Sequence, residues 1–120
     1  MKTTKPVLER AQLVMGKCVA LHKGDAYTEA EVDAQLLALP DWSRHDAAIE
    51  RSFGFRDYYE TIAFVNALAW IAHREDHHPE LTVGYNRCRV RWSTHTTGGV
   101  SHNDFVCAAK TDAVFGSGSN

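Results

Sequence analysis

Four histidines in the second half of the chain are the residues best suited to chemistry. His73, His77 and His78 lie at or just beyond the end of a predicted helix, and His95 lies at the end of a predicted strand. Imidazole has an unperturbed pKa of about 6.5, so it can both donate and accept a proton near neutral pH. The same side chain also binds metal ions, so proton transfer and metal binding are the two chemistries to compare.

The spacing of His73 and His77 would allow a shared metal ion, because side chains four residues apart lie on one face of a helix. Zinc-binding helices of this kind place Glu directly after the first histidine or directly before the second. Arg74 and Asp76 occupy those positions here. We therefore expect no metal site, and a metal-dependent hydrolase built on His73, His77 and His95 is the weaker alternative. In a third interpretation the histidines only complement the dipole at the helix end.

A longer pattern contains these histidines. It is "HREDHHPELTVGYNRCRVRWSTHTTGGVSHND", residues 73 to 104. It resembles the signature of pterin-4a-carbinolamine dehydratases, a family also called dimerisation cofactors of a homeodomain transcription factor. The resemblance covers roughly residues 28 to 115. The matching positions are His73, His77, His78, Pro79, Tyr85, His95 and Asp104.

The resemblance implies a hydro-lyase, a 4a-hydroxytetrahydrobiopterin dehydratase. Such an enzyme removes water from a 4a-hydroxytetrahydropterin and gives a quinonoid dihydropterin, in the recycling of tetrahydropterin after aromatic amino acid hydroxylation. Hydroxide is a poor leaving group, so an acid must protonate it while a base takes the proton of ring nitrogen N5. Each well-placed proton transfer is worth about 10² to 10⁴ in rate. The resemblance implies no cofactor and no metal, a pterin substrate and a functional link to a hydroxylase.

The resemblance also implies roles for individual residues. His77, His78 and His95 would be catalytic: His78 would hold the pterin and accept its N5 proton, and His77 and His95 would be acids on the two faces of the leaving hydroxyl. Asp104 would orient His95 or bind the polar edge of the pterin, and its alternative role is an N-terminal helix carboxylate. Trp42 would form an apolar wall of the substrate pocket, or else belong to the core or its rim.

One position departs from the family pattern. Family members often carry a carboxylate where this chain has His73, and that carboxylate could hold and charge the imidazole that follows. A second imidazole would lower its neighbour's proton affinity rather than raise it. Glu75 and Asp76 are the nearby carboxylates that could replace it at His77.

Helical periodicity marks four segments of the chain. One begins with a capping box of Thr28 and Glu31 and stops at Pro40, and another has Asp57 as its N-cap. Gly16 weakens the first segment, so about three helices are expected. The four segments are residues 5–21, 27–42, 56–76 and 101–115. The aromatic residues expected in the core are Phe64, Trp70, Tyr85 and Trp92.

Two segments alternate between polar and apolar residues, as half-buried strands do. Residues 48–55 do so with Arg51 as a polar exception on the apolar side, and residues 81–95 do so twice around a turn at 86 and 87, which predicts a hairpin. The fold class is therefore α+β, an antiparallel sheet of about four strands with about three α-helices packed on one face. Exposed sheet edges or helix faces would make the protein a homodimer or a homotetramer.

Length and composition are those of one soluble domain over residues 1–120. Residues 1–25 are an extension outside the resemblance, and residues 116–120 are expected to be a flexible tail. With 44% hydrophobic residues, 23% charged residues and a net charge of −2, nothing indicates binding to nucleic acid. No apolar stretch approaches the length of a membrane span or forms a secretory signal, so we expect a cytoplasmic protein.

The three cysteines, Cys18, Cys88 and Cys107, form no CxxC pair and are expected to be reduced and mostly buried. Outside catalysis, the strongest rival function is that of a binding or dimerisation module. Animal members of the family also stabilise a transcription factor dimer, a role that would use an exposed helix face rather than the histidines.

Overall fold

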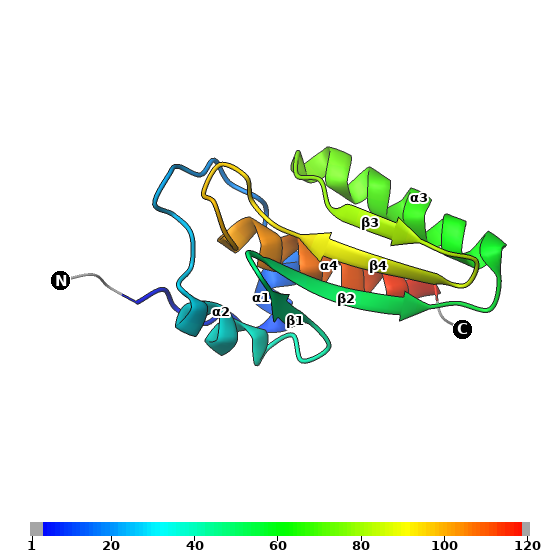
Figure 1. Ribbon diagram of the computed structural model, residues 1–120, viewed down its shortest axis with the longest axis horizontal. Helices are drawn as coiled ribbons and strands as arrows, with labels where there is room; N and C mark the ends of the chain where they lie inside the picture. The colour runs from blue at the N-terminus through cyan, green and yellow to red at the C-terminus, as the bar shows by residue number, and fades with distance from the viewer. Residues whose placement is uncertain (1–3, 119–120) are drawn as a thin grey trace.

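The computed structural model describes residues 4–118, with the side chains of residues 4–116. Its centre is a four-stranded antiparallel sheet in the order β1-β2-β4-β3 (Figure 1). The predicted α+β class is confirmed. In chain order the elements are α1 (Arg10–Met15), α2 (Glu29–Leu36), β1 (Ser43–His45), β2 (Ala48–Gly54), α3 (Tyr58–Glu75), β3 (Glu80–Val83), β4 (Arg87–Trp92) and α4 (His102–Gly118).

The sheet has one apolar face and one charged face, because side chains alternate along each strand. In β4, Val90 and Trp92 are fully buried, whereas Arg91 between them is partly exposed. On the neighbouring strand Ile49 lies opposite Trp92 and Glu50 lies opposite Arg91. Arg91 Nη1 donates to Glu50 Oε2 at 3.2 Å, so a cross-strand ion pair lies on the charged face. The apolar face is left for the helices to cover.

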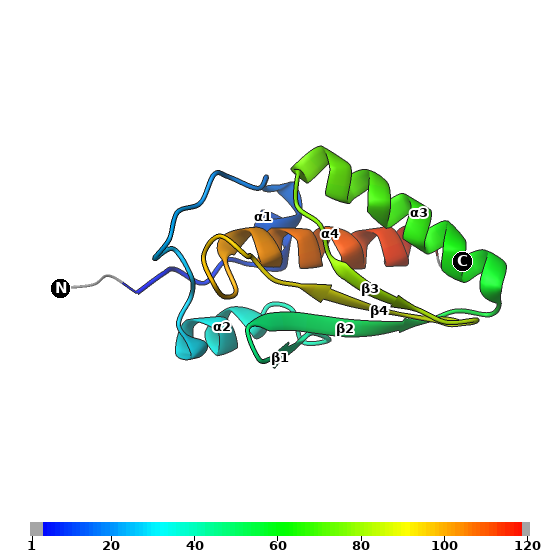
Figure 2. The same ribbon diagram turned by 45° about the horizontal axis from the view of Figure 1, so that its top comes forward.

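The helices α3 and α4 lie side by side across the apolar face, and α1 packs against α4 (Figure 2). The short helix α2 lies beside β1 at the edge of the sheet. Its predicted capping box is confirmed, since the Thr28 side chain accepts from Glu31 N–H while the Glu31 side chain accepts from Thr28 N–H. Asp57 is the N-cap of α3, as expected, and accepts from Glu60 N–H at 2.9 Å.

Two aromatic residues that we expected in the core are exposed. Phe64 and Trp92 are buried, but 60% of Trp70 and 65% of Tyr85 are exposed, so the prediction was wrong for these two. Tyr85 lies beyond the end of β3 in the hairpin turn, where strand alternation no longer applies. Trp70 lies on the side of α3 that lines an open groove, where Arg74 stacks over its ring at 4.7 Å.

Arg51 is the polar residue that alternation placed on the apolar side of β2. Its guanidinium lies over the Phe53 ring at 4.4 Å, and Nη1 lies 2.7 Å from Asp112 Oδ1 on α4. The buried Asp112 carboxylate also accepts from Trp42 Nε1 at 2.9 Å and from Arg10 Nη1 of α1 at 2.7 Å. A paired, hydrogen-bonded carboxylate is tolerated in a core, so Asp112 ties β2, α1 and α4 together.

Both ends of the described chain are more ordered than a loose extension and a flexible tail would be. The described part of the N-terminal extension packs on α2, because Leu8 N–H donates to Gln35 Oε1 and Gln35 Nε2 donates to Leu8 O. At the other end α4 continues to Gly118, so helix reaches into the expected flexible tail, whose last two residues lie outside the described part. No helix among residues 4–118 is both long enough and apolar enough to span a bilayer.

Candidate active site

A histidine and a buried carboxylate meet where α3 ends and α4 begins. His77 Nε2 lies 2.6 Å from Asp104 Oδ1. The Asp104 side chain has no exposed surface, whereas 14% of the His77 side chain is exposed. An ionised carboxylate can only accept, so Nε2 carries the hydrogen of this bond. Nδ1 is then the ring nitrogen that can give or take a proton elsewhere.

The Asp104 carboxylate is itself held by two further donors. Its Oδ2 accepts from Ser101 N–H at 2.9 Å and from Thr94 Oγ1 at 2.8 Å. Thr94 Oγ1 also lies 2.6 Å from Ser101 Oγ, and since the single Thr94 proton goes to Asp104, Ser101 must donate in that bond. Asp104 also lies in the first turn of α4, where the helix dipole favours a negative charge. The carboxylate therefore has one fixed orientation toward His77.

The His77 ring is fixed on its flat side as well. It stacks on Trp92, with ring centroids 5.3 Å apart and planes inclined by 19°. Trp92 is itself immobilised, since it is fully buried in β4 and its Nε1 donates to Thr111 Oγ1 at 3.2 Å. Packing on one face and a hydrogen bond on one edge leave the ring little freedom to rotate.

The way in which α3 ends places His77 next to Asp104. Asp76 has φ 52° and ψ 44°, the left-handed C-cap conformation that commonly ends helices. His77 N–H then donates to Ala72 O at 3.1 Å, which closes the last turn. The chain reverses there, and Pro79 restricts the backbone of the residue before it, His78. The positions of His77 and His78 are therefore set by the way in which α3 ends.

A tight loop carries Thr94 and Ser101 to the carboxylate. Thr94 and Gly99 form an isolated antiparallel bridge, and Gly98 N–H donates to Thr94 O at 3.1 Å. Gly98 has φ 75°, a conformation that glycine adopts without steric cost. His95 lies on this loop, next to Thr94 in the chain. The loop therefore places His95 at the border of the network without joining it.

The structure unites some of the expected site residues and not others. Asp104, which we expected to orient His95 or to bind the polar edge of the pterin, bonds to His77, and its two expected roles stay predictions. His78 and His95 have exposed side chains, and within residues 4–118 neither side chain makes a hydrogen bond or ion pair. Each is one residue away from a member of the network. Their roles toward a substrate stay predictions.

The carboxylate that holds His77 comes from α4 and not from position 73, 75 or 76. His73 is exposed on the last turn of α3. Glu75 does not hold His77, because its Oε1 accepts from Cys18 N–H at 2.8 Å, and the side chain of Asp76 is exposed. Asp104 supplies the charge from α4. Sequence reasoning missed this pairing, since the two residues are 27 positions apart.

Trp42 lies in the core, with only 3% of its surface exposed. It packs edge-on against Phe53 and its indole N–H donates to Asp112, which fits the alternative of a core tryptophan. Its role as a pocket wall stays a prediction. Sequence reasoning did not single out Trp92, Thr94 or Ser101 as site residues; the only signal was that Thr94 precedes His95 and Ser101 begins the last helix.

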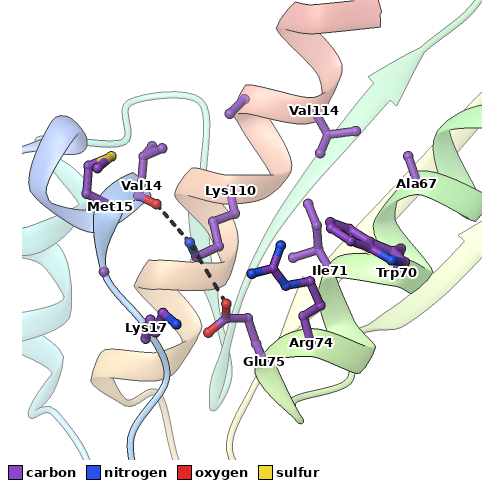
Figure 3. Close-up of a pocket in the computed structure, with 12 residues that line it drawn as sticks. Val14, Met15, Lys17, Ala67, Trp70, Ile71, Arg74, Glu75, Lys110 and Val114 are labelled. Carbon is purple, nitrogen blue, oxygen red and sulfur yellow. Dashed lines mark hydrogen bonds and ion pairs between the residues drawn. The ribbon is translucent and has the colours of Figure 1, made fainter.

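Two further features are separate from this network. A groove of about 620 Å³ lies between α1, α3 and α4 and is lined in part by Val14, Trp70, Ile71 and Val114 (Figure 3). None of the four histidines contributes to it. Residues 4–118 contain no group of three or more His, Cys, Asp or Glu side chains placed to hold a metal ion.

Comparisons with known proteins agree with the signature. The family model described as pterin 4 alpha carbinolamine dehydratase matches residues 25–114. A protein of Stenotrophomonas maltophilia is 54% identical over 106 residues, which cover 85% of this chain and 90% of that protein. One of Nitrosospira multiformis is 51% identical over 88 residues, 73% of this chain and 78% of that protein. Both carry the provisional name pterin-4-alpha-carbinolamine dehydratase.

A solved structure shares the fold. It is described as a transcriptional coactivator/pterin dehydratase from Brucella melitensis, with a TM-score of 0.71 and 38% identity, and the match covers 74% of this chain and 97% of that one. The range matched by the family model, residues 25–114, contains His77, His78, His95 and Asp104. The chain therefore belongs to the pterin-4-alpha-carbinolamine dehydratase family.

Proposed function

We propose that this protein removes water from a 4a-hydroxytetrahydropterin and gives a quinonoid dihydropterin, with histidines as the acids and bases. Family membership supports the reaction class. The observation that carries the residue assignment is the 2.6 Å contact between His77 Nε2 and Asp104 Oδ1 within a network of buried donors. A histidine fixed on one edge by a carboxylate, with its other nitrogen free, is the usual arrangement of an acid–base imidazole.

The dehydration needs one proton delivered and one removed. The C4a–O bond breaks and its electron pair leaves with the hydroxyl, which takes a proton and departs as water. The N5–H bond gives up its proton, and the electron pair of that bond forms the C4a=N5 double bond. His77 delivers the first proton from Nδ1, and Asp104 stabilises the cationic ring until then. In this scheme Asp104 is a positioning residue and never touches the substrate.

His78 and His95 complete the scheme. Their exposed rings are free to meet a flat substrate, in contrast to the fixed ring of His77. His78 holds the pterin and accepts the N5 proton, and His95 is the acid for a hydroxyl on the opposite face. Each imidazole returns to its starting state by exchange with water. Trp42 would contribute only if substrate binding exposed its ring.

The setting follows from the chemistry of the substrate. A 4a-hydroxytetrahydropterin is the product that a pterin-dependent aromatic amino acid hydroxylase releases, so such an enzyme supplies the substrate. The protein would work in the cytoplasm as a homodimer or homotetramer. Two alternatives have less support. The hydrogen-bond network around Asp104 contains one histidine rather than the three that a metal-dependent hydrolase would need. Family membership favours the dehydratase over a pure binding module.

The test follows the ultraviolet absorbance of a synthetic 4a-hydroxytetrahydropterin with the wild type and with His77→Ala, His78→Ala and His95→Ala. At least two of the three should lose about tenfold or more in kcat/KM. His45→Ala is the matched control, because His45 is an exposed histidine on β1 outside the network. Equal rates for all three variants and the control, with all four folded, would refute the proposal.

A further inference from the structure

Two of the three cysteines meet between the N-terminal extension and α4. Cys18 Sγ lies 3.5 Å from Cys107 Sγ, although 89 residues separate them. Cys107 is fully buried, whereas Cys18 is partly exposed. Sulfur atoms in a disulfide are about 2.05 Å apart, so a closing movement of about 1.5 Å would bring this pair to bonding distance. The odd count and wide spacing of the cysteines hid this contact from sequence reasoning.

Hydrogen bonds on both sides hold the Cys18 backbone in place. Cys18 N–H donates to Glu75 Oε1 at 2.8 Å at the end of α3. The next residue, Val19, forms two hydrogen bonds with the Asn103 side chain of α4, at 2.9 Å and 2.8 Å. Figure 3 shows the Glu75 carboxylate between α3 and α4, directed toward Lys110 and close to where the chain leaves α1. The hydrogen bonds of Cys18 and Val19 therefore hold the Cys18 side chain next to α4.

The segment that carries Cys18 can still make the small movement required. The chain from Gly16 to Leu21 has neither helix nor strand. A change in its backbone angles breaks no helical or sheet hydrogen bond, whereas Cys107 is fixed in the middle of α4. The thiol outside regular secondary structure is thus the more exposed one, and the thiol within α4 is the buried one.

The two thiols have different chemical surroundings. The contact with Cys18 and burial both raise the pKa of the Cys107 thiol, so Cys107 stays protonated and screened from solvent. An oxidant from solution therefore reaches Cys18 first. Cys107 is then the resolving thiol, already in van der Waals contact with the sulfur that it must attack.

We propose that Cys18 and Cys107 form a reversible intramolecular disulfide, which makes this pair a site of thiol oxidation by peroxides. The Cys18 sulfur attacks one peroxide oxygen, the O–O bond breaks, and one water leaves after proton transfer, giving a sulfenic acid. The Cys107 sulfur then attacks the Cys18 sulfur, and its proton leaves with the hydroxyl as a second water. The sulfur pair loses two electrons, and one peroxide is reduced. A dithiol reductant reverses the reaction.

The disulfide would act as a staple between the extension and α4. It would join residues that are 89 positions apart, so it would remove much of the freedom of the unfolded chain. Cys107 lies about one helical turn after Asp104, so the staple would hold the extension against the part of α4 that carries the His77 partner. The proposal depends on thiol geometry alone and does not depend on the proposed function.

The experiment oxidises the purified full-length protein with hydrogen peroxide and measures intact mass, free thiols after denaturation, and thermal unfolding. The wild type should lose about 2 Da, keep one of its three thiols and yield a cross-linked peptide joining Cys18 to Cys107. Its Tm should rise by about 5 °C or more and return after reduction. Cys88→Ser, the matched control at a buried cysteine outside the pair, should lose the same mass and keep no thiol.

Cys18→Ser is the decisive variant, because position 18 is partly exposed and the substitution should fold. It should keep both remaining thiols and show no loss of about 2 Da. Three free thiols in the treated wild type, disulfides only between separate chains, or added oxygen without cross-linking would each overturn the proposal. An oxidised protein whose Tm is unchanged or lower would contradict the claim that the disulfide stabilises the fold.

Discussion

Two buried carboxylates on α4 are held in similar ways and have different partners. Asp104 and Asp112 are eight residues apart, about two helical turns, and each accepts hydrogen bonds from other elements of the fold. Asp112 pairs with Arg51 and Arg10, side chains that keep their charge at every physiological pH. Asp104 pairs with His77, whose ring can gain or lose a proton.

Under the proposed function, the partner of the carboxylate, rather than the carboxylate itself, separates a structural site from a chemical one. Both aspartates are almost fully buried, and both would be costly to leave unpaired. The Arg51 guanidinium lies among aromatic rings and pairs with Asp112, so the Asp112 cluster holds elements of the fold together. The His77 side chain is partly exposed, and under the proposed function it exchanges a proton with the substrate there.

The largest effect on activity is expected for Asp104→Asn. The amide keeps the shape and can still accept from Thr94 and Ser101, but it removes the charge and can donate to His77 Nε2, which would favour the wrong tautomer. We expect kcat to fall by about 10²-fold or more, with little change in KM. The pH profile of kcat/KM should change shape as well. A fall in activity that only follows lost stability, with an unchanged pH profile, would make Asp104 purely structural.

Asp112→Asn should produce the opposite result. It leaves the partly buried Arg51 without its main counter-charge, so we expect the free energy of unfolding to fall by about 3 kcal/mol, measured by urea denaturation. The kcat of the folded protein should stay within about twofold, because Asp112 does not contact the histidine network. If Asp112→Asn reduced kcat as strongly as Asp104→Asn, the distinction between the two carboxylates would fail.

A smaller effect is expected for Thr94→Val. The substitution removes one donor from Asp104 and leaves Ser101 Oγ without its acceptor, while the side-chain volume is nearly kept. We expect a loss of about 1 to 2 kcal/mol in stability and of about fivefold in kcat, measured on the same preparations. Thr97→Val is the control, since Thr97 Oγ1 bonds only to backbone carbonyls of the same loop. If Thr97→Val lost as much stability and kcat as Thr94→Val, the effect would come from the loop and not from the hydrogen bond to Asp104.

The smallest effect is expected at a third carboxylate, in the capping box of α2. The N–H groups of Lys5 and Thr28 lower the pKa of Glu31 to about 2, below its ordinary value of 4.5. Ionised Glu31 therefore stabilises the fold above about pH 4.5, and this contribution is lost as the pH falls toward 2. In Glu31→Gln the urea midpoint should be lower at neutral pH and should change less between pH 5 and pH 3. An equal slope in Glu31→Gln and in the exposed control Glu29→Gln would contradict this.

Sequence patterns over a few neighbouring residues predicted the longer, regular helices and strands. Hydrophobic periodicity and N-caps located α2, α3, β2 and the hairpin, because these signals depend only on residues a few positions apart. The strand β1 was missed, since its three residues are too few to show alternation. The exposure of Trp70 was mispredicted because an aromatic residue on a helix gives no sign of which face the neighbouring elements leave open.

By itself the sequence determined the family, the α+β class and the set of histidines, because a motif and a periodicity are properties of the linear chain. Only the tertiary structure decided which carboxylate holds His77 and which cysteines meet. Asp104 reaches His77 across 27 residues and Cys107 reaches Cys18 across 89, so both contacts exist only after helices and loops have packed together. Packing depends on the sum of many distant contacts, and no local pattern records that sum.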